Sequence, residues 1–352
     1  GRGATADAGG RLMRAIVARL DSDGDVLLAG PAIRAVAAGA EHVTLLCGPG
    51  GAQAAALLPG VDEIVVRRAE WIDPEAGQVD RAGIDAYVDR LEAIGADAAV
   101  VLTSFHQSAL PLALLLRMAG VWRIAAISPD FPGSLLDVRH PDPGDVHEVE
   151  RGLSVAATLG FRLPSGDAGR LSVRAEDPGF AVPEGAVVVH PGASVPARAW
   201  SPDQNARLVQ ALADAGSPVL VTGAPAERAL TAHVAGPPRP EVTDLGGRTS
   251  LAGMAGVLAR ARAVVVGNTG PAHLAAAVGT PVVSLFAPTV PAVRWRPWAV
   301  RHELLHVDVP CAGCRARICP VAGHPCLSGV AVADVLAALE RVTEPSRQPV
   351  PA

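Results

Sequence analysis

Short apolar runs rich in Val, Ile and Leu alternate with longer stretches rich in Ala and Leu along most of the chain. Such alternation is typical of strands and helices that wind through a parallel sheet. The pattern occurs in the first half of the chain and restarts in the second half. Strands are predicted at residues 14–19, 42–47, 63–66, 98–102 and 123–127, and again at 186–190, 218–222, 263–267 and 281–286.

Helices are expected between these strands. The first is predicted to begin near Asp25 and to run to residue 38, with Pro31 early enough that its missing N–H costs little. The other expected helices are 110–116, 145–159, 202–215, 226–234, 250–261, 271–278 and 331–342. The sequence therefore predicts two similar α/β halves with a cleft between them.

Length and composition indicate where these halves begin and end. A chain of 352 residues is expected to form about two domains. The segment 164–184 is rich in Pro, Gly and Asp and lacks a long apolar run, which is typical of a linker region. We therefore predict a flexible leader at 1–12, an N-terminal domain at 13–163, a linker region at 164–184, a C-terminal domain at 185–342 and a flexible tail at 343–352.

Charge and hydropathy exclude several classes of protein. The formal net charge is −5, so the chain lacks the basic surface that nucleic-acid binding requires. The most apolar stretch, 109–116, stops at Arg117 and is much shorter than the ~20 residues of a membrane-spanning helix. The first residues contain no apolar segment of a secretory signal. These features predict a cytoplasmic protein with no transmembrane segment.

Polar residues gather where predicted strands end and helices begin, and the clearest such junction follows the third strand of the second half. Asn268, Thr269 and Gly270 form a tight turn there, and His273 lies in the first turn of the next helix. The Thr269 hydroxyl, the free N–H groups of the helix N-terminus and His273 can together surround a phosphate group. The alternative is that Thr269 only caps the helix and Gly270 only permits the turn, although capping and phosphate binding can coexist.

A second junction follows the strand that ends at His190. Ser194 can hydrogen-bond phosphate oxygens, and Arg198 can neutralise a diphosphate through a forked contact. The alternatives are that Arg198 is a surface charge and that the nearby Trp200 is a packing anchor rather than a catalytic group.

The third junction is acidic and lies in the first half. Asp21, Asp23 and Asp25 follow the first strand in a short loop that contains Gly24. A carboxylate here can act as a general base that takes a proton from an acceptor hydroxyl, and all three aspartates compete for this role. The alternative for Asp25 is a carboxylate in the first turn of the helix, where it contributes ~1 kcal/mol of helix stability.

Three motifs occur in order along the chain: Gly24-Asp25 with Pro31, His190-Pro-Gly-Ala, and Asn268-Thr-Gly-Pro-Ala-His273. In this order and spacing they resemble the heptosyltransferase-like glycosyltransferases, glycosyltransferase family 9, over residues 13–342. The resemblance implies a GT-B fold, an α/β architecture in which two Rossmann-like, doubly wound domains face an interdomain cleft. The acceptor is then expected on the N-terminal domain and the donor on the C-terminal domain. The resemblance also implies inverting transfer of a sugar from a nucleotide diphosphate sugar, usually ADP-heptose, with no required metal or other cofactor.

The same resemblance implies roles for individual residues. Asp25 matches the proposed catalytic base of the family. Ser194 and Arg198 match its phosphate-contacting hydroxyl and basic residue, although the family commonly has Lys at the position of Arg198. Glu227 matches an acidic residue that binds the nucleoside or ribose of the donor. The loop that holds the diphosphate is matched by Thr269, Gly270 and His273.

Asn268 departs from the family pattern, because many members have Asp at this position. An amide can neither carry negative charge nor act as a base, but it keeps the shape needed for hydrogen bonding. We therefore expect Asn268 to bind the donor with an altered preference for the sugar.

The motifs leave the acceptor and two other functions open. The acceptor can be a glycan, a glycolipid or a secondary-metabolite hydroxyl, and a lipid acceptor would favour peripheral contact with a membrane. A nucleotide-sugar epimerase is one alternative function, because the same cleft can bind a nucleotide sugar without transferring it. A non-catalytic nucleotide-sugar binding protein is the other; Asn268 favours it, whereas the intact Asp25 loop disfavours it.

The five cysteines divide into one isolated residue and a cluster. Cys47 lies in a predicted strand and is expected to be a small buried residue. The other four follow the spacing Cys-x2-Cys-x4-Cys-Pro-x5-Cys near His324, which in a cytoplasmic protein indicates metal binding rather than disulfides. A structural Zn2+ that cross-links an irregular loop is one hypothesis, and a loop without metal is the other. The residues concerned are Cys311, Cys314, Cys319 and Cys326.

Overall fold

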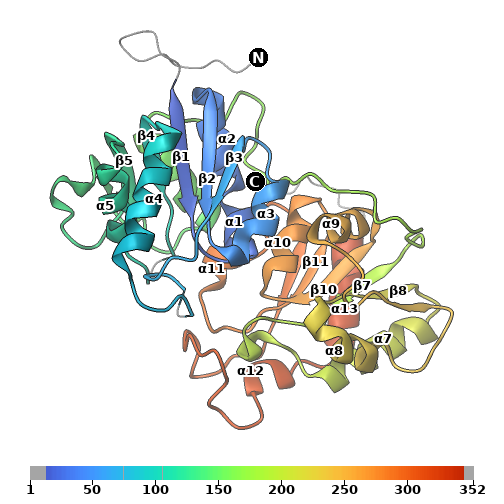
Figure 1. Cartoon of the computed structure of the whole chain (residues 1–352). Coiled ribbons are helices and arrows are strands. Elements are labelled where there is room, and N and C mark those ends of the chain that lie inside the picture. The colour runs from blue at the N-terminus through green and yellow to red at the C-terminus, as the bar shows by residue number, and fades with distance from the viewer. Residues whose placement is uncertain (1–12, 74, 105, 345–352) are drawn as a thin grey trace. The chain divides into compact units, whose positions relative to one another are not determined.

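The computed structural model describes residues 13–73, 75–104 and 106–344. The chain forms two compact units that divide between Ser172 and Val173, inside the segment 164–184. Each unit contains one parallel six-stranded sheet with flanking helices (Figure 1). The expected leader at 1–12 lies outside the described residues, as do residues 345–352 of the expected tail.

The sheet of the first unit has the strand order β3-β2-β1-β4-β5-β6, and its strands are parallel throughout. The five strands that the sequence predicts here are confirmed, with β4 one residue shorter. The sequence does not predict β6, because this short edge strand is half-buried or exposed and carries no apolar signal. The strands are β1 (Arg14–Arg19), β2 (His42–Cys47), β3 (Glu63–Val66), β4 (Ala98–Val101), β5 (Arg123–Ile127) and β6 (Val138–His140).

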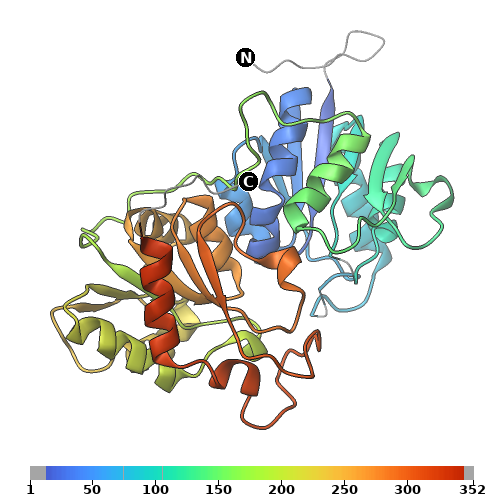
Figure 2. The ribbon, with the colours of Figure 1, turned by 180° about the vertical axis from the view of Figure 1, so that it is seen from behind.

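Helices cover both faces of this sheet. α4 and α5 pack on one face, where apolar side chains such as Leu91 and Leu112 form the core. α2 and α6 pack against each other on the opposite face (Figure 2). The described helices are α1 (Asp23–Leu28), α2 (Gly30–Gly39), α3 (Ala52–Leu57), α4 (Arg81–Ile94), α5 (Leu110–Met118) and α6 (Glu148–Thr158), with short 3-10 helices at Pro49–Gly51 and Gly133–Leu135.

The prediction of one helix over 25–38 is wrong. The chain instead forms α1 and α2, which meet at Ala29. Pro31 has no N–H to donate to the carbonyl of Leu27, so the regular hydrogen-bond ladder stops in this turn. The N–H of Ile33 then donates to the carbonyl of Ala29, with 3.0 Å between N and O, and α2 continues from there.

The sheet of the second unit has the order β12-β11-β10-β7-β8-β9 and is also parallel. Read from β9 to β12 and counted from its first strand, β7, this order is the same as that of the first unit. The four predicted strands are confirmed to within one residue at each end, whereas β9 and β12 are not predicted, because no residue in these edge strands is fully buried. The strands are β7 (Val187–His190), β8 (Val219–Val221), β9 (Val242–Asp244), β10 (Ala263–Gly267), β11 (Val282–Leu285) and β12 (His302–Leu305).

The helices of the second unit also lie on both faces of their sheet. α7, α8 and α13 share one apolar core with the strands, and α13 is seen in front in Figure 2. α9 and α10 pack together on the other face. The described helices are α7 (Pro202–Asp214), α8 (Arg228–Ala235), α9 (Leu251–Arg260), α10 (Gly270–Ala277), α11 (Ala292–Trp295), α12 (Pro325–Ser328) and α13 (Val332–Thr343), with 3-10 helices at Pro196–Arg198 and Pro225–Glu227.

The apolar run at 110–116 lies in α5, where Leu112 and Leu116 are buried in the core. In the part of the chain that the structure describes, no helix is both long enough and apolar enough to cross a membrane.

The strand order of each sheet reverses beside its first strand. β1 lies between β2 and β4, and β7 lies between β8 and β10. The connections that leave the carboxyl ends of two such neighbouring strands run in opposite directions and leave a crevice. Open parallel sheets bind ligands in this crevice. A site is therefore expected in the loops that follow β1 and β4, and in those that follow β7 and β10.

One arginine ties the segment after α6 to α2. Arg34 donates from Nε and Nη2 to the two carboxylate oxygens of Asp167, at 2.7 and 2.9 Å. Its Nη2 also donates to the carbonyl of Arg170 at 2.7 Å. The hydrogen bonds from Arg34 hold the pKa of Asp167 below its ordinary value.

We expect Asp167→Asn to lower the free energy of unfolding by about 1 kcal/mol at pH 7, or roughly 2–4 °C in Tm, because it removes the charge from this two-pronged ion pair. The pKa of Asp167 is depressed in the folded protein, so the pair stabilises the fold above the ordinary aspartate pKa. That contribution is lost as the pH falls through the folded-state pKa. In a thermal unfolding series, the gap between variant and wild type should therefore shrink below about pH 4.

Asp85→Asn is the matched control, because Asp85 pairs with Arg81 on an exposed surface of α4. A control that loses as much Tm as Asp167→Asn, or a Tm gap between Asp167→Asn and wild type that persists at low pH, would contradict this role of the Arg34–Asp167 ion pair.

Candidate functional site

A buried arginine organises the loop that follows β1. Arg19 is the last residue of β1 and is 4% exposed. Its Nε lies 2.9 Å from Oδ2 of Asp21, its Nη2 donates to Oδ1 of Asp25 at 2.8 Å, and its Nη1 lies 3.5 Å from Oε2 of Glu148. Burial opposes the charge of Arg19, but the attraction of Asp21, Asp25 and Glu148 outweighs it and raises the pKa of Arg19. Arg19 is therefore a fixed positive charge among three carboxylates.

Two of the three candidate bases make contacts that hold the loop together. Asp21 accepts hydrogen bonds from the side chains of Ser104 and Gln107, and burial raises the pKa of Asp21. Asp23 accepts from the N–H of Ala54 in α3 at 2.9 Å, and burial raises its pKa too. Their hydrogen bonds tie both carboxylates to neighbouring segments of the protein.

Of the three aspartates, only Asp25 lines a pocket described in the first unit. The pocket lies at the carboxyl ends of β1, β4 and β5, beside α6, and its cavity volume is about 20 Å³. Asp25 is 21% exposed, and its Oδ2 accepts from Oγ of Ser22 at 2.9 Å. The polar residues that line the pocket are Arg19, Asp25, Thr103, Glu148 and Arg151. Geometry thus favours Asp25 as the carboxylate that meets a ligand.

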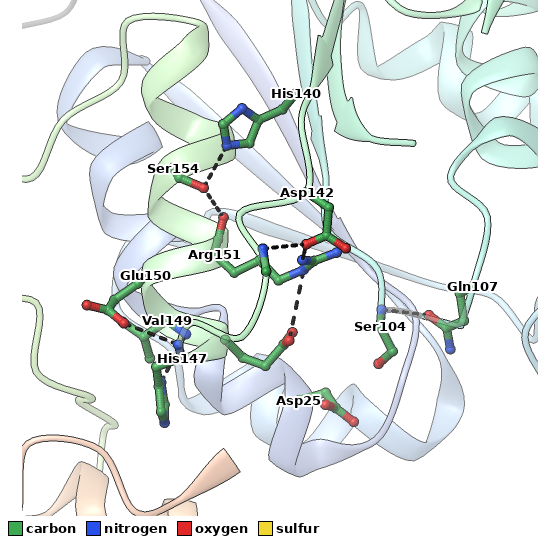
Figure 3. A network of polar contacts seen from close by, with 12 residues as sticks. Asp25, Ser104, Gln107, His140, Asp142, His147, Val149, Glu150, Arg151 and Ser154 are labelled. Atoms are coloured by element: carbon green, nitrogen blue, oxygen red, sulfur yellow. Dashed lines mark hydrogen bonds and ion pairs between the residues drawn. The ribbon is translucent and has the colours of Figure 1, made fainter. Parts of the chain in front are cut away.

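The ion-pair network around the pocket contains more carboxylates than guanidinium groups, whereas the pocket lining itself contains two of each. Arg151 is buried and pairs with Asp142 (Figure 3). Its Nε lies 3.9 Å from Oε1 of Glu148. This excess favours a neutral or cationic group of a ligand over an anionic one. The carboxylates around the two guanidinium groups of Arg19 and Arg151 are those of Asp21, Asp25, Asp142 and Glu148.

In the second unit, the loop after β10 presents buried polar atoms that lack a partner among the described residues. They are Oδ1 of Asn268 and Oγ1 of Thr269. Nδ2 of Asn268 donates to the carbonyl of Ala287 at 3.3 Å. Thr269 occupies the N-cap position of α10, but its side chain makes no capping hydrogen bond. The capping alternative for the Thr269 hydroxyl is therefore wrong, and this hydroxyl is available to a ligand.

The helix that begins here brings two more predicted residues to the loop. Gly270 is the first residue of α10, where helix N–H groups have no partner within the helix. His273 lies in the first turn of α10 and is buried. The arrangement is that of an anion-binding helix N-terminus with a histidine in its first turn.

The loop after β7 packs directly against the end of β10. A Cβ on Gly267 would lie 2.7 Å from the carbonyl oxygen of Arg198, so only glycine lets the 3-10 helix of Arg198 come this close. Arg198 is half-buried, and Ser194 is exposed on the same loop. Trp200 is buried in the core with Leu208, which confirms that it is a packing anchor.

Glu227 is held against the start of the same loop. A Cβ on Gly192 would lie 2.0 Å from Oε1 of Glu227, so the missing side chain makes room for the carboxylate. Oε2 of Glu227 accepts from the N–H of Ala224 at 2.8 Å. Nδ1 of His190, at the end of β7, lies 3.0 Å from Oγ1 of Thr222. Burial lowers the pKa of His190, which keeps the ring neutral at neutral pH.

The cysteine-rich segment contacts the loop after β11 and the loop after β7. The N–H groups of Gly313 and Arg315 donate to the carbonyls of Pro288 and Thr289, at 2.7 and 2.9 Å. Near the Arg198 loop, the N–H of Ala197 donates to the carbonyl of Arg317 at 3.0 Å, and Nε2 of His324 lies 3.1 Å from the carbonyl of Ala197.

No group of three or more His, Cys, Asp or Glu side chains is arranged to hold a metal ion within the described ranges. The zinc hypothesis for Cys311, Cys314, Cys319 and Cys326 is thus unsupported, and all four are thiols in the structure. Cys47 is fully buried in β2, as the sequence predicts.

The residues of the first-unit pocket that sequence reasoning missed are Arg19, Glu148 and Arg151. Arg19 had a signal, because a charged residue at the end of an otherwise apolar strand is unusual. Glu148 and Arg151 had none, since their positions in α6 resemble those of ordinary surface charges.

The chain matches a protein-family model described as glycosyltransferase family 9 (heptosyltransferase) over residues 87–324. It is 34% identical over 226 residues to lipopolysaccharide heptosyltransferase 1 of Pseudomonas aeruginosa. The aligned segment covers 60% of this chain and 61% of that protein. It is 31% identical over 162 residues to lipopolysaccharide heptosyltransferase 3 of Escherichia coli K12. This alignment covers 43% of this chain and 47% of that protein. The matches thus span about half to three fifths of the length of these relatives.

Solved structures show the same architecture. A glycosyl transferase family 9 protein from Veillonella parvula aligns with a TM-score of 0.78 at 18% identity, covering 94% of this chain and 97% of that one. The E. coli heptosyltransferase WaaC, solved with ADP, aligns with a TM-score of 0.69 at 22% identity, covering 94% and 97%. These similarities confirm the expected fold class, with two Rossmann-like α/β units of the GT-B type.

The charge balance at the β1 loop predicts effects of very different size on stability for two substitutions. Arg19→Met is expected to lower the free energy of unfolding by about 3–5 kcal/mol, because it leaves three carboxylates without their buried cation. Asp25→Asn is expected to stay within about 1 kcal/mol of wild type, because it removes charge from a site with excess carboxylates. Urea unfolding of both variants measures the difference, and equal losses would show that the charge balance is described wrongly.

Proposed function

The chain belongs to glycosyltransferase family 9, the heptosyltransferase family, and from this premise we propose that it transfers a heptose from ADP-heptose to a hydroxyl group of a lipopolysaccharide-type glycan. The curated relatives named above are lipopolysaccharide heptosyltransferases. WaaC has been solved with ADP and also with ADP-2-deoxy-2-fluoro heptose. Both findings support a nucleotide-sugar donor for this chain.

The observation that carries the proposal is the loop after β10. Asn268 and Thr269 keep buried polar atoms without a partner among the described residues, beside the N-terminus of α10. Such an atom costs about 1–3 kcal/mol of stability, so it is best explained by a ligand that supplies the partner. A nucleotide sugar supplies both phosphate oxygens and hydroxyl groups.

We assign donor binding to the second unit. The N–H of Gly270 and the dipole of α10 hold the diphosphate, with His273 and Ser194 as further hydrogen-bond donors. Arg198 neutralises the charge that grows on the diphosphate as it leaves. Glu227 accepts hydrogen bonds from the ribose hydroxyls of the nucleoside.

We assign acceptor activation to the first unit. Asp25 takes the proton from the acceptor hydroxyl, whose oxygen then attacks the anomeric carbon of the heptose. The bond from that carbon to the diphosphate breaks, and its electron pair leaves on ADP. Attack on the face opposite to the leaving group inverts the anomeric configuration. Arg19, 2.8 Å from Asp25, stabilises the ionised carboxylate that this step requires.

The two alternative functions, a nucleotide-sugar epimerase and a non-catalytic nucleotide-sugar binding protein, fit the residues of the first unit and the named relatives less well. A non-catalytic nucleotide-sugar binding protein needs no carboxylate held by a buried arginine in a pocket. The curated relatives named above are transferases, which favours transfer over epimerisation. A glycolipid or a secondary metabolite remains an alternative acceptor to a glycan. We also propose a cytoplasmic location, which the free thiols favour because thiols persist in reducing compartments.

Nucleotide binding tests the donor assignment directly. Calorimetry with ADP, GDP, UDP and dTDP is expected to show selective binding of ADP by the wild type. His273→Ala should weaken ADP binding about 10-fold or more, because it removes a donor beside the diphosphate. Absence of binding to all four nucleotides would argue against the donor site, and undiminished binding by His273→Ala would argue against this role of His273.

Asp25→Asn tests the assignment of the base. With ADP-heptose and a heptose-free lipopolysaccharide core as acceptor, the variant is expected to lose at least about 100-fold in kcat, because amides do not accept the proton. Its affinity for ADP should stay within about twofold of wild type, since Asp25 is assigned to the acceptor. Near-normal turnover of Asp25→Asn would overturn the assignment.

A further inference from the structure

Thr289 presents a buried hydroxyl from a backbone that is fixed on both sides. It follows β11, and its N–H donates to the carbonyl of Ala287 at 2.7 Å. Its carbonyl accepts from the N–H of Arg315 at 2.9 Å. The residue is 4% exposed, and its Oγ1 has no hydrogen-bond partner among the described residues.

Asn268 and Thr289 both donate a hydrogen bond to the carbonyl of Ala287. β10 and β11 are neighbours in the sheet, with Gly267 opposite Leu285, so the loops that follow them leave side by side. Nδ2 of Asn268 donates to the carbonyl of Ala287 at 3.3 Å, the carbonyl that Thr289 also uses. Because only the NH2 group of the amide can donate to a carbonyl, this contact fixes Oδ1 as the other end of the side chain.

Two neutral residues that donate to the same carbonyl group therefore each keep an unsatisfied polar atom. Oδ1 of Asn268 can only accept a hydrogen bond, whereas the hydroxyl of Thr289 can donate or accept. A phosphate oxygen without a proton cannot satisfy Oδ1, because it too is an acceptor. A hydroxyl group can donate to Oδ1 and can also bond to Thr289.

We propose that Asn268 and Thr289 together form the subsite that binds a hydroxyl group of the transferred sugar. This inference rests on the proposed function, because it takes the second unit as the donor site. Thr289 is thereby a specificity-determining residue of the donor site. The subsite distinguishes a polyhydroxylated sugar from its deoxy analogue, because a missing hydroxyl leaves two buried polar groups unpaired.

The test compares the affinities for ADP-heptose and for ADP, measured by calorimetry without an acceptor. Thr289→Val keeps the shape of the side chain and removes its hydroxyl, and Asn268→Leu removes the amide. Each is expected to weaken binding of ADP-heptose roughly 5- to 10-fold, the size of one lost hydrogen bond. Binding of ADP, which lacks the sugar, should stay within about twofold of wild type.

Ser284→Ala is the matched control. Ser284 is fully buried, and its hydroxyl also lacks a partner among the described residues, but it lies within β11 opposite Val266 rather than in the loop. This variant should bind both ligands like the wild type. The Tm of Thr289→Val should not fall, because the lost hydroxyl makes no hydrogen bond within the described protein.

Each contrary outcome has a distinct meaning. Wild-type affinity of Thr289→Val and Asn268→Leu for ADP-heptose overturns the subsite. Equal weakening for ADP and ADP-heptose, with a lower Tm or with the same loss in Ser284→Ala, also overturns it and indicates a structural role. A wild-type protein that binds neither ligand overturns the proposed function itself, and the subsite with it.

Discussion

The reversal of strand order beside the first strand of each sheet determines where both candidate sites lie. β1 and β4 in the first unit, and β7 and β10 in the second, are neighbours whose following loops run in opposite directions. Asp25 lies after β1, and Asn268, Thr269 and Gly270 lie after β10. The crevice that results needs no special sequence, because it follows from winding helices around a parallel sheet in both directions. The sequence contributes the polar groups that occupy it.

The two sites use these crevices in different ways. In the first unit, the polar groups are charged and form an ion-paired network around Arg19. Such a network holds a carboxylate in one orientation, which suits proton transfer. In the second unit, Asn268, Thr269 and Thr289 are neutral, and some of their buried polar atoms lack partners among the described residues. Unsatisfied neutral groups at a helix N-terminus suit recognition of a ligand that brings hydroxyl and phosphate groups.

The central strands and the positions of the motifs were predictable from the sequence, because buried strands leave apolar runs and loops leave Gly, Pro and Asp. Edge strands such as β6 and β9 were not, since partial exposure erases that signal. From the residues alone Asp21, Asp23 and Asp25 were equivalent candidates, and the family resemblance singled out Asp25. The contacts that tie Asp21 and Asp23 to the fold agree with that proposal. The proposed role of Thr289 could not be found from sequence either, because it rests on a hydroxyl without a partner among the described residues, and partners are visible only in three dimensions.

Release of ADP from ADP-heptose, followed with and without an acceptor glycan, tests the central claim most directly. The account predicts that the donor alone is returned unchanged, and that ADP and an anomerically inverted product form together once a suitable acceptor hydroxyl is present. Isomerisation of the sugar without acceptor, or tight binding of ADP-heptose with no ADP released across a panel of glycan, glycolipid and small-molecule acceptors, would contradict it.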